Sequence, residues 1–171
     1  RAERDPRAEH LGEEDLAVAL ERVQVRGEEL ERVRRVPCQQ RGPLPRYALD
    51  LHSAAIHRSN LPQIRVDSGD NEALRLAEAF GAPIIIHSGL REGSLRHVAQ
   101  DRGVPVIVYE AGEGLRVDDL SVRIGMRGVL GVMAELRMIR QRKRGRRLAP
   151  ALSTSSRWVR ADESGLFRPF K

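Results

Sequence analysis

Three short apolar runs of the chain are each followed by a polar side chain that could take part in catalysis. The first run ends in Asp50-Leu51-His52, the second ends in His87, and the third leads to Glu110. Ligands of open α/β sheets bind beyond the carboxyl ends of the strands, so these side chains are the first candidates for a site. An imidazole and a carboxylate on neighbouring strand ends suit a zinc site, in which the imidazole binds the metal and the carboxylate takes a proton from bound water.

Each of these residues also has a structural interpretation. A histidine at a strand end is often a hydrogen-bonded structural residue, and Glu110 could equally cap a helix or pair with a basic side chain. His87 is a rival to His52, because it ends the central apolar run and could line the pocket. His57 is interpreted as a loop histidine. Glu113 is interpreted as a neighbour of the candidate base Glu110 or as the cap of the next helix. The residues alone leave these alternatives open.

The elements that would position these residues form an alternating pattern. Apolar runs predict three strands, and helical periodicity between and after them predicts three helices. The second and third runs are apolar on both faces, as in strands that helices cover on both sides. The sequence therefore predicts an α/β fold with a mostly parallel sheet covered by helices. The predicted strands are residues 47–51, 83–86 and 104–108, and the predicted helices are about residues 70–80, 92–101 and 118–139.

The chain divides into four predicted segments. Residues 1–45 are dense in Arg and Glu and predict a polar helical extension, whereas residues 46–139 carry the α/β pattern. Residues 140–152 form a basic linker. Residues 153–171 have the turn residues and alternation that begin a small β module, with Trp158 as its expected core.

The net charge of +6 is concentrated in one segment of the 171 residues. Seven basic residues and no acidic residue lie from Arg137 to Arg147, and without them the chain would be close to neutral. This run supports a hypothesis of a different class, a module that binds nucleic acid or another polyanion. Aromatic residues make up only 4% of the chain and none lies within the run, so stacking platforms are missing and a solvated linker is favoured.

Cysteine content and hydropathy limit the cellular compartments that the sequence predicts. Cys38 is the only cysteine, which excludes an internal disulfide and a cysteine-rich metal site. No run of about 18 apolar residues predicts a membrane span, and a cytoplasmic protein is expected. The chain begins with Arg1 and ends within a strand-like pattern, so both ends look truncated and an upstream targeting segment stays open. The oligomeric state is not predicted.

Two stretches of the chain resemble one enzyme family. Residues 48–65, with Asp-Leu-His at 50–52, resemble a segment of the succinylglutamate desuccinylase/aspartoacylase family, which is related to zinc carboxypeptidases. Gly93-Ser94-Leu95-Arg96 and the stretch from Pro105, which ends Val-Tyr-Glu-Ala-Gly, resemble a later segment of the same family. The resemblance covers residues 47–139 and implies a zinc exopeptidase-like α/β fold. Residues from Ser156 onward resemble the start of the β-rich module that follows in many bacterial members.

The resemblance implies roles for five residues. His52 would be a zinc ligand, and Glu110 would be the general base that activates the zinc-bound water and later protonates the leaving amine. Asp50 would lie behind His52 and orient it, as carboxylates often do behind metal-bound imidazoles. Arg65 and Arg96 are candidates for binding a substrate carboxylate, because a guanidinium presents paired donors to it.

The two arginines also have structural interpretations. Arg65 could form an ion pair with Asp67 or Asp70, and Arg96 could be a solvated residue on a helix surface. If the resemblance holds, the intact protein binds one zinc ion and hydrolyses an N-acyl amino acid or a similar amide or ester. Its partner would then be a small-molecule substrate that carries a carboxylate.

The first zinc-binding motif of the family is missing in its expected setting. That motif is His-x-x-Glu after an N-terminal strand, and an Asp-Leu-Asn-Arg-like motif for the substrate follows it. His10-Leu11-Gly12-Glu13 fits the first motif by letter, but no apolar strand precedes it. Catalytic zinc has three protein ligands, so one imidazole does not suffice. The expected function is a zinc-dependent deacylase that is incomplete in this chain. The alternative is a catalytically silent relative with a structural or polyanion-binding role.

Overall fold

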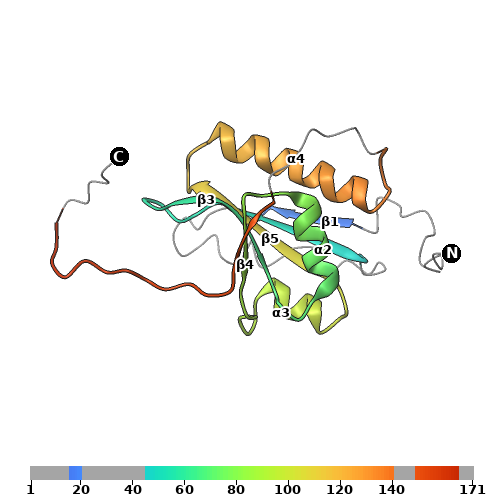
Figure 1. The fold of residues 1–171 in the computed structure, drawn as a ribbon, viewed down its shortest axis with the longest axis horizontal. Helices are drawn as coiled ribbons and strands as arrows, with labels where there is room; N and C mark the ends of the chain where they lie inside the picture. The colour runs from blue at the N-terminus through green and yellow to red at the C-terminus, as the bar shows by residue number, and fades with distance from the viewer. Residues whose placement is uncertain (1–15, 21–44, 141–148, 166–171) are drawn as a thin grey trace, which may run out of the picture.

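The computed structural model describes residues 16–20, 45–140 and 149–165, which form a six-stranded sheet with helices on both faces (Figure 1). The strand order is β1-β2-β5-β3-β4-β6. The strands are β1 (Leu16–Leu20), β2 (Tyr47–His52), β3 (Ser59–Val66), β4 (Ile84–His87), β5 (Val106–Glu113) and β6 (Ala151–Ser153), and the helices are α2 (Asn71–Phe80), α3 (Leu95–Gln100) and α4 (Asp119–Glu135).

Parallel pairing dominates the sheet. All neighbouring strands are parallel except β3 and β5, which are antiparallel. The predicted α/β class with a mostly parallel sheet is therefore confirmed, and so are the three predicted strands and the three predicted helices. The antiparallel pair has one consequence for the site. Because β4 runs opposite to β2 and β5, the carboxyl end of β4 points away from that of β2, and Ile84 rather than His87 lies level with Glu110.

Strand β3 was not predicted, because Pro62 and several polar residues interrupt its apolar pattern. The register between β3 and β5 shifts between Asn60 and Gln63, which is a β-bulge. Proline cannot donate to the hydrogen-bond ladder, and within sheets it is confined to edges, strand starts and bulges. The bulge therefore lets Pro62 lie inside a strand that has neighbours on both sides.

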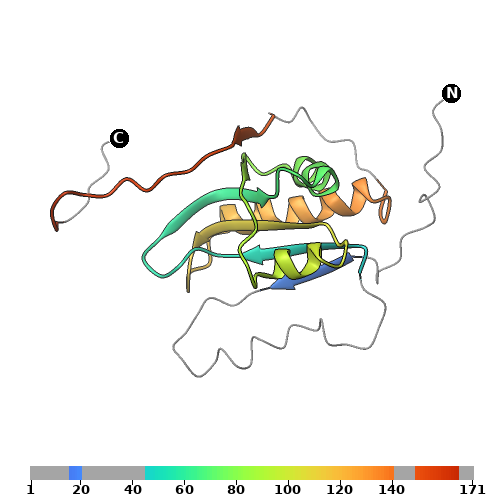
Figure 2. The same ribbon diagram turned by 90° about the horizontal axis from the view of Figure 1, so that it is seen from below.

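Helices α2 and α4 cover one face of the sheet, and α3 covers the other (Figure 2). Helix α2 begins after Asp70, whose side chain accepts from the Ala73 amide at 2.9 Å, and ends at Gly81 in the left-handed region. Its apolar side packs into the main core, where the Phe80 and Tyr109 ring centroids lie 4.9 Å apart. Within the described parts of the chain, no helix is both long and apolar enough to cross a membrane.

The structure corrects the prediction for the N-terminal segment at residues 16–20. These residues were expected in a polar helix but form β1, which pairs in parallel with β2. The Arg- and Glu-rich flanks suggested a helix, whereas the five apolar residues themselves suit a strand beside β2. Residues 1–15 and 21–44 of that segment lie outside the described residues.

The C-terminal part of the described chain begins by joining the main sheet. Residues 151–153, at the predicted border between linker and β module, form β6 and pair with β4. Residues 154–165 contain no strand, and residues 166–171 lie outside the described residues, so the β module stays a prediction. Trp158 was expected in a core, but it is 75% exposed and its ring lies 5.5 Å from the guanidinium carbon of Arg58. Most of the basic run lies in residues 141–148, which are not among the described residues.

Candidate active site

The predicted zinc ligand and the predicted base are neighbours across two parallel strands. His52, the last residue of β2, and Glu110 of β5 are register partners. Strand β5 continues to Glu113, so Glu110 lies within its strand, whereas the sequence had suggested a position after it. Side chains alternate along a strand, so Asp50 lies on the same face as His52. Asp50 is only 4% exposed, and its Oδ2 is 2.9 Å from His52 Nε2. The buried carboxylate thus fixes the orientation of the imidazole.

Strand β3 holds the carboxylate of Glu110 from the other side. Arg65 Nε lies 2.9 Å from Glu110 Oε1 in an ion pair. The second oxygen, Oε2, accepts hydrogen bonds from Asn60 Nδ2 at 3.0 Å and Gln63 Nε2 at 3.3 Å. Sequence reasoning missed Asn60 and Gln63, because their strand was not predicted. It had paired Arg65 with Asp67 or Asp70 as the structural alternative, whereas the structure pairs this arginine with Glu110.

Arg96 is attached to the connection between β4 and α3. Its guanidinium donates to the Ser88 carbonyl at 3.2 Å, to Ser88 Oγ at 3.1 Å and to the Gly89 carbonyl at 3.2 Å. Burial lowers the pKa of Arg96, while the charge of Asp67 acts in the opposite direction. The hydrogen bonds give Arg96 a structural role in this loop, and its role in substrate binding stays a prediction.

Glu113 anchors the loop that follows His52. Its Oε1 accepts a hydrogen bond from the His57 amide at 3.0 Å, and its Oε2 lies 3.4 Å from Arg116 Nε. His57 has a positive φ of 63° in this exposed loop. The loop conformation next to the proposed ligand therefore depends on a carboxylate three residues beyond the proposed base.

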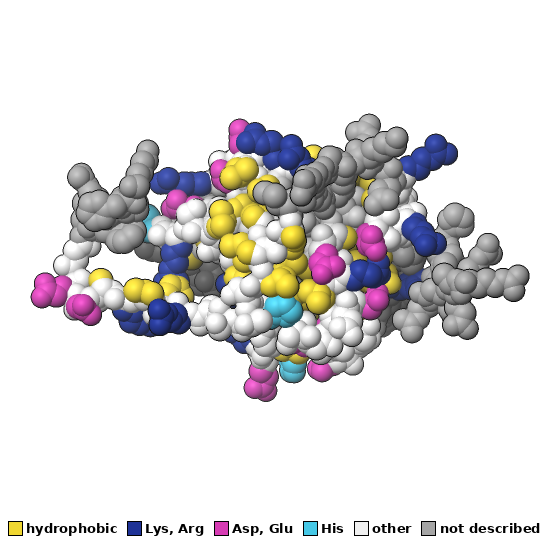
Figure 3. Space-filling view, in the orientation of Figure 1, with side chains coloured by type: hydrophobic (Ala, Val, Ile, Leu, Met, Phe, Trp, Pro, Cys, Tyr) yellow, Lys and Arg dark blue, Asp and Glu magenta, His cyan; other side chains and the backbone are white. Residues whose placement is uncertain are grey.

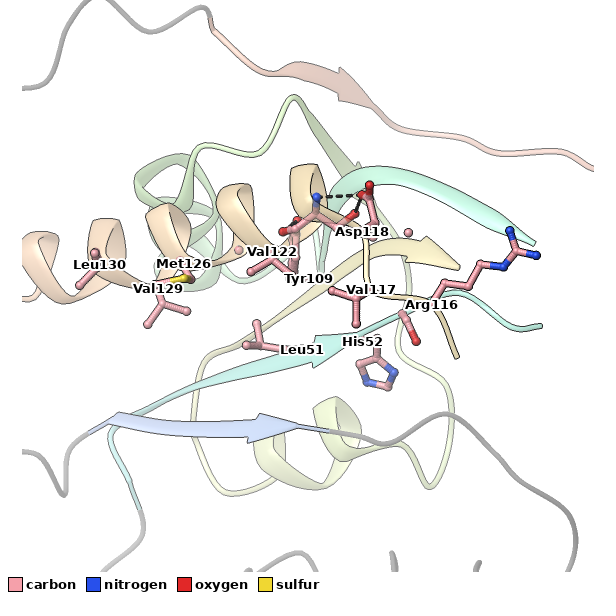
Figure 4. Close-up of a pocket in the computed structure, with 15 residues that line it drawn as sticks. Leu51, His52, Tyr109, Arg116, Val117, Asp118, Val122, Met126, Val129 and Leu130 are labelled. Atoms are coloured by element: carbon pink, nitrogen blue, oxygen red, sulfur yellow. Dashed lines mark hydrogen bonds between the residues drawn. The ribbon is translucent and has the colours of Figure 1, made fainter. Parts of the chain in front are cut away.

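An apolar cavity of about 610 Å³ lies between α4 and strands β2 and β5 (Figure 4). Leu51 and Tyr109 belong to its wall, and these residues alternate along their strands with His52 and Glu110. His52 and Ser53 reach its lining, but Asp50, Arg65 and Glu110 do not. The charged cluster is therefore separate from the main volume of the cavity. The remaining lining residues are Ala111, Gly112, Arg116, Val117, Asp118, Ser121, Val122, Gly125, Met126, Val129 and Leu130.

The described residues do not fit a complete catalytic zinc centre. In the ranges 16–20, 45–140 and 149–165, no three His, Cys, Asp or Glu side chains are grouped so that they could hold a metal ion. His52 with Asp50 behind it matches one imidazole ligand and its supporting carboxylate, and Asp50 Oδ1 is buried with no hydrogen-bond partner among the described residues. Catalytic zinc needs two further protein ligands. His10 and Glu13 lie outside the described residues.

A mostly parallel α/β sheet with an imidazole and a carboxylate paired on neighbouring strands is an arrangement suited to a hydrolytic domain. The sequence profile of the succinylglutamate desuccinylase/aspartoacylase catalytic domain matches residues 10–136. The chain therefore belongs to this family, as the sequence resemblance predicted. The match begins at residue 10, so it includes much of the segment 1–45 that had been set apart from the family.

Several solved structures share the fold. An aspartoacylase family protein from Mesorhizobium loti is 19% identical with a TM-score of 0.53, and the match covers 75% of this chain and 38% of that one. A succinylglutamate desuccinylase from a Silicibacter species is 18% identical with a TM-score of 0.53, and the match covers 64% of this chain and 34% of that one. The product-bound ectoine utilization protein of Ruegeria pomeroyi is 17% identical with a TM-score of 0.52, and the match covers 66% of this chain and 35% of that one.

The chain spans about a third of the length of these relatives. A search of curated protein sequences gave no match.

Proposed function

We propose that the chain contributes part of a zinc-dependent deacylase site that acts on an N-acyl amino acid or a similar amide or ester. Membership of the family supports a deacylase-type function. The observation that carries the proposal is the register pairing of His52 with Glu110, with Asp50 located 2.9 Å behind the imidazole. This pairing brings a potential ligand and a potential base to one place on one face of the sheet.

The residues of the site divide the work as follows. Glu110 takes a proton from the attacking water and returns it to the leaving amine. Asp50 holds His52 in one orientation. Arg65 contacts Glu110 through Nε, and the edge formed by its two terminal amines receives the carboxylate of the substrate.

Zinc is part of the proposal, with His52 as one ligand and the others supplied from outside the described residues. His10-x-x-Glu13 is the candidate pair, since the family match starts at residue 10. Atomic spectroscopy of the purified chain tests this assignment. We expect near-equimolar zinc that is lost in His52→Ala and in His10→Ala. His97→Ala is the matched control, because His97 Nδ1 accepts from the Gly93 amide on an exposed turn, and it should retain the metal. A chain without zinc would reject the metal site in this protein.

Hydrolysis is tested with a panel of N-acyl amino acids by detecting the released amine. Replacing a general base costs about 10²- to 10⁴-fold in rate, so Glu110→Gln should lose activity to this degree while its zinc content stays unchanged. If wild-type protein with bound zinc releases no amine from any member of the panel, the deacylase proposal fails.

A catalytically silent relative is the second candidate, and the incomplete ligand set among the described residues favours it. A polyanion-binding role has less support. On the face shown in Figure 3, the described Lys and Arg side chains lie mostly around the margin, and hydrophobic side chains occupy the middle. Retention on a heparin column at moderate salt would support polyanion binding. The cytoplasmic location stays a prediction.

A further inference from the structure

We infer that Glu110 and a ligand carboxylate compete for the charge of Arg65, so that the proposed base itself limits how tightly the site holds an anion. The inference rests on the proposed function, because it concerns the same site. It goes beyond the roles proposed for Glu110 and Arg65, because it states that the charge of Glu110 weakens the binding of a carboxylate at Arg65.

The contact between Arg65 and Glu110 leaves room for this competition. The ion pair joins Arg65 Nε to Glu110 Oε1 at 2.9 Å, and the two side chains are 33% and 23% exposed. Both side chains are therefore partly open to solvent, although the Nε atom of Arg65 itself is buried. Because Glu110 contacts Nε, the edge formed by the two terminal amines can still face a second carboxylate, but its charge is already partly neutralised.

Two further hydrogen bonds hold Glu110 in place. Its Oε2 is held by the amide groups of Asn60 and Gln63, at 3.0 and 3.3 Å. A ligand carboxylate on Arg65 would lie beside a fixed negative charge in a partly buried site, where charges are screened less than in water. The repulsion between the two carboxylates therefore persists in the complex.

The other charges near Arg65 do not favour a second anion. Arg96 feels negative charges from Asp67, Glu110 and Asp50 and a positive charge from Arg65. The Arg96 guanidinium is also held by Ser88 and Gly89, which fixes it on its loop. An added carboxylate would increase the negative charge of this cluster, and removal of the Glu110 charge would offset it.

Calorimetric titration with N-acetylglycine, and with N-acetylglycinamide as its uncharged counterpart, tests the inference on the full chain. We expect Glu110→Gln to bind N-acetylglycine about tenfold more tightly than the wild type, and Arg65→Gln to lose this binding. Affinity for the amide should not rise in Glu110→Gln. Arg65→Lys, which keeps the charge, should recover part of the anion binding lost in Arg65→Gln.

Glu135→Gln is the matched control. Glu135 Oε1 pairs with Arg75 Nη1 at 2.7 Å on the helices of the opposite face, so this variant removes an arginine-paired acid far from the site. Its affinity for N-acetylglycine should equal that of the wild type. Equal or weaker binding by Glu110→Gln, retained binding by Arg65→Gln, or no binding by either wild type or Glu110→Gln would overturn the inference.

The proposed function and this inference fail in different ways. Calorimetry measures binding without turnover. If the wild-type protein releases no amine but Glu110→Gln binds N-acetylglycine more tightly than the wild type, the proposed function is wrong and the inference stands. If the wild-type protein hydrolyses N-acyl amino acids but the wild type and Glu110→Gln bind N-acetylglycine equally well, the proposed function stands and the inference is wrong. Circular dichroism of each variant verifies that it is folded.

Discussion

Asn60 and Gln63 donate hydrogen bonds to the same oxygen of Glu110, although they lie three residues apart in one strand. In a regular strand, side chains at an odd spacing point to opposite faces. The register shift between these two residues inserts one extra residue into β3. Both amides therefore lie on the same face of the sheet, where they contact Glu110. The bulge that accommodates Pro62 therefore also fixes the carboxylate of the proposed base.

This arrangement predicts that the two amides stabilise the fold. Asn60→Ala and Gln63→Ala should each lower the free energy of unfolding by about 0.5–1.5 kcal/mol, because each removes a partly buried hydrogen bond to a carboxylate. Urea denaturation measures the loss. Gln100→Ala is the control, since its amide donates to Asp67 at 3.4 Å on the exposed surface, and it should change stability by less than about 0.5 kcal/mol. Losses in the β3 variants no larger than in Gln100→Ala would contradict the prediction.

Gly128 in α4 should not tolerate a methyl group. A Cβ atom at this position would overlap the ring of Phe80 in α2. Alanine is normally better than glycine in a helix by about 1 kcal/mol, but overpacking a core costs about 1–3 kcal/mol. We therefore expect Gly128→Ala to lower the thermal midpoint. Gly89→Ala, where a Cβ atom would meet nothing within 4 Å, should leave the midpoint unchanged. A midpoint raised by Gly128→Ala would show that the two helices are not in close contact.

Tyr109 should make stability depend on pH in the alkaline range. Burial raises the pKa of its phenol from 10.0 to about 12, with a further contribution from Asp118, and its hydroxyl donates to the Ser121 carbonyl at 2.8 Å. The neutral phenol is favoured in the folded state. Stability is therefore fully present below pH 10 and falls as the pH rises toward the folded pKa, because the unfolded chain releases this proton first. Denaturation between pH 9 and pH 12 measures the slope, and Tyr109→Phe should reduce it whereas Tyr47→Phe should not.

Much of the α/β pattern could be predicted from the sequence, because the runs that contain Ile85 and Ile107 are apolar on both faces and signal strands directly. The sequence placed His52 and Glu110 on neighbouring strands, as the structure does, but it ended the second of these strands too early, because β5 continues past Glu110 to Glu113. The reversal of direction at β3 could not be predicted, because Pro62 interrupts the pattern of this strand. His87 was therefore considered with His52 as a pocket residue, although its strand runs the other way. The amide donors of Glu110 were missed for the same reason.

Strand β6 lies on the outer edge of β4, where the Ala151 amide donates to the Pro83 carbonyl at 2.9 Å. An uncovered strand edge presents backbone donors and acceptors that can template pairing with another chain. A chain cut before residue 149 would leave the edge of β4 without this cover. In the full chain strand β6 is the edge of the sheet, and it is only three residues long, which is one way in which proteins limit edge-to-edge pairing. We therefore expect the shortened chain to self-associate more than the full chain, which light scattering would detect.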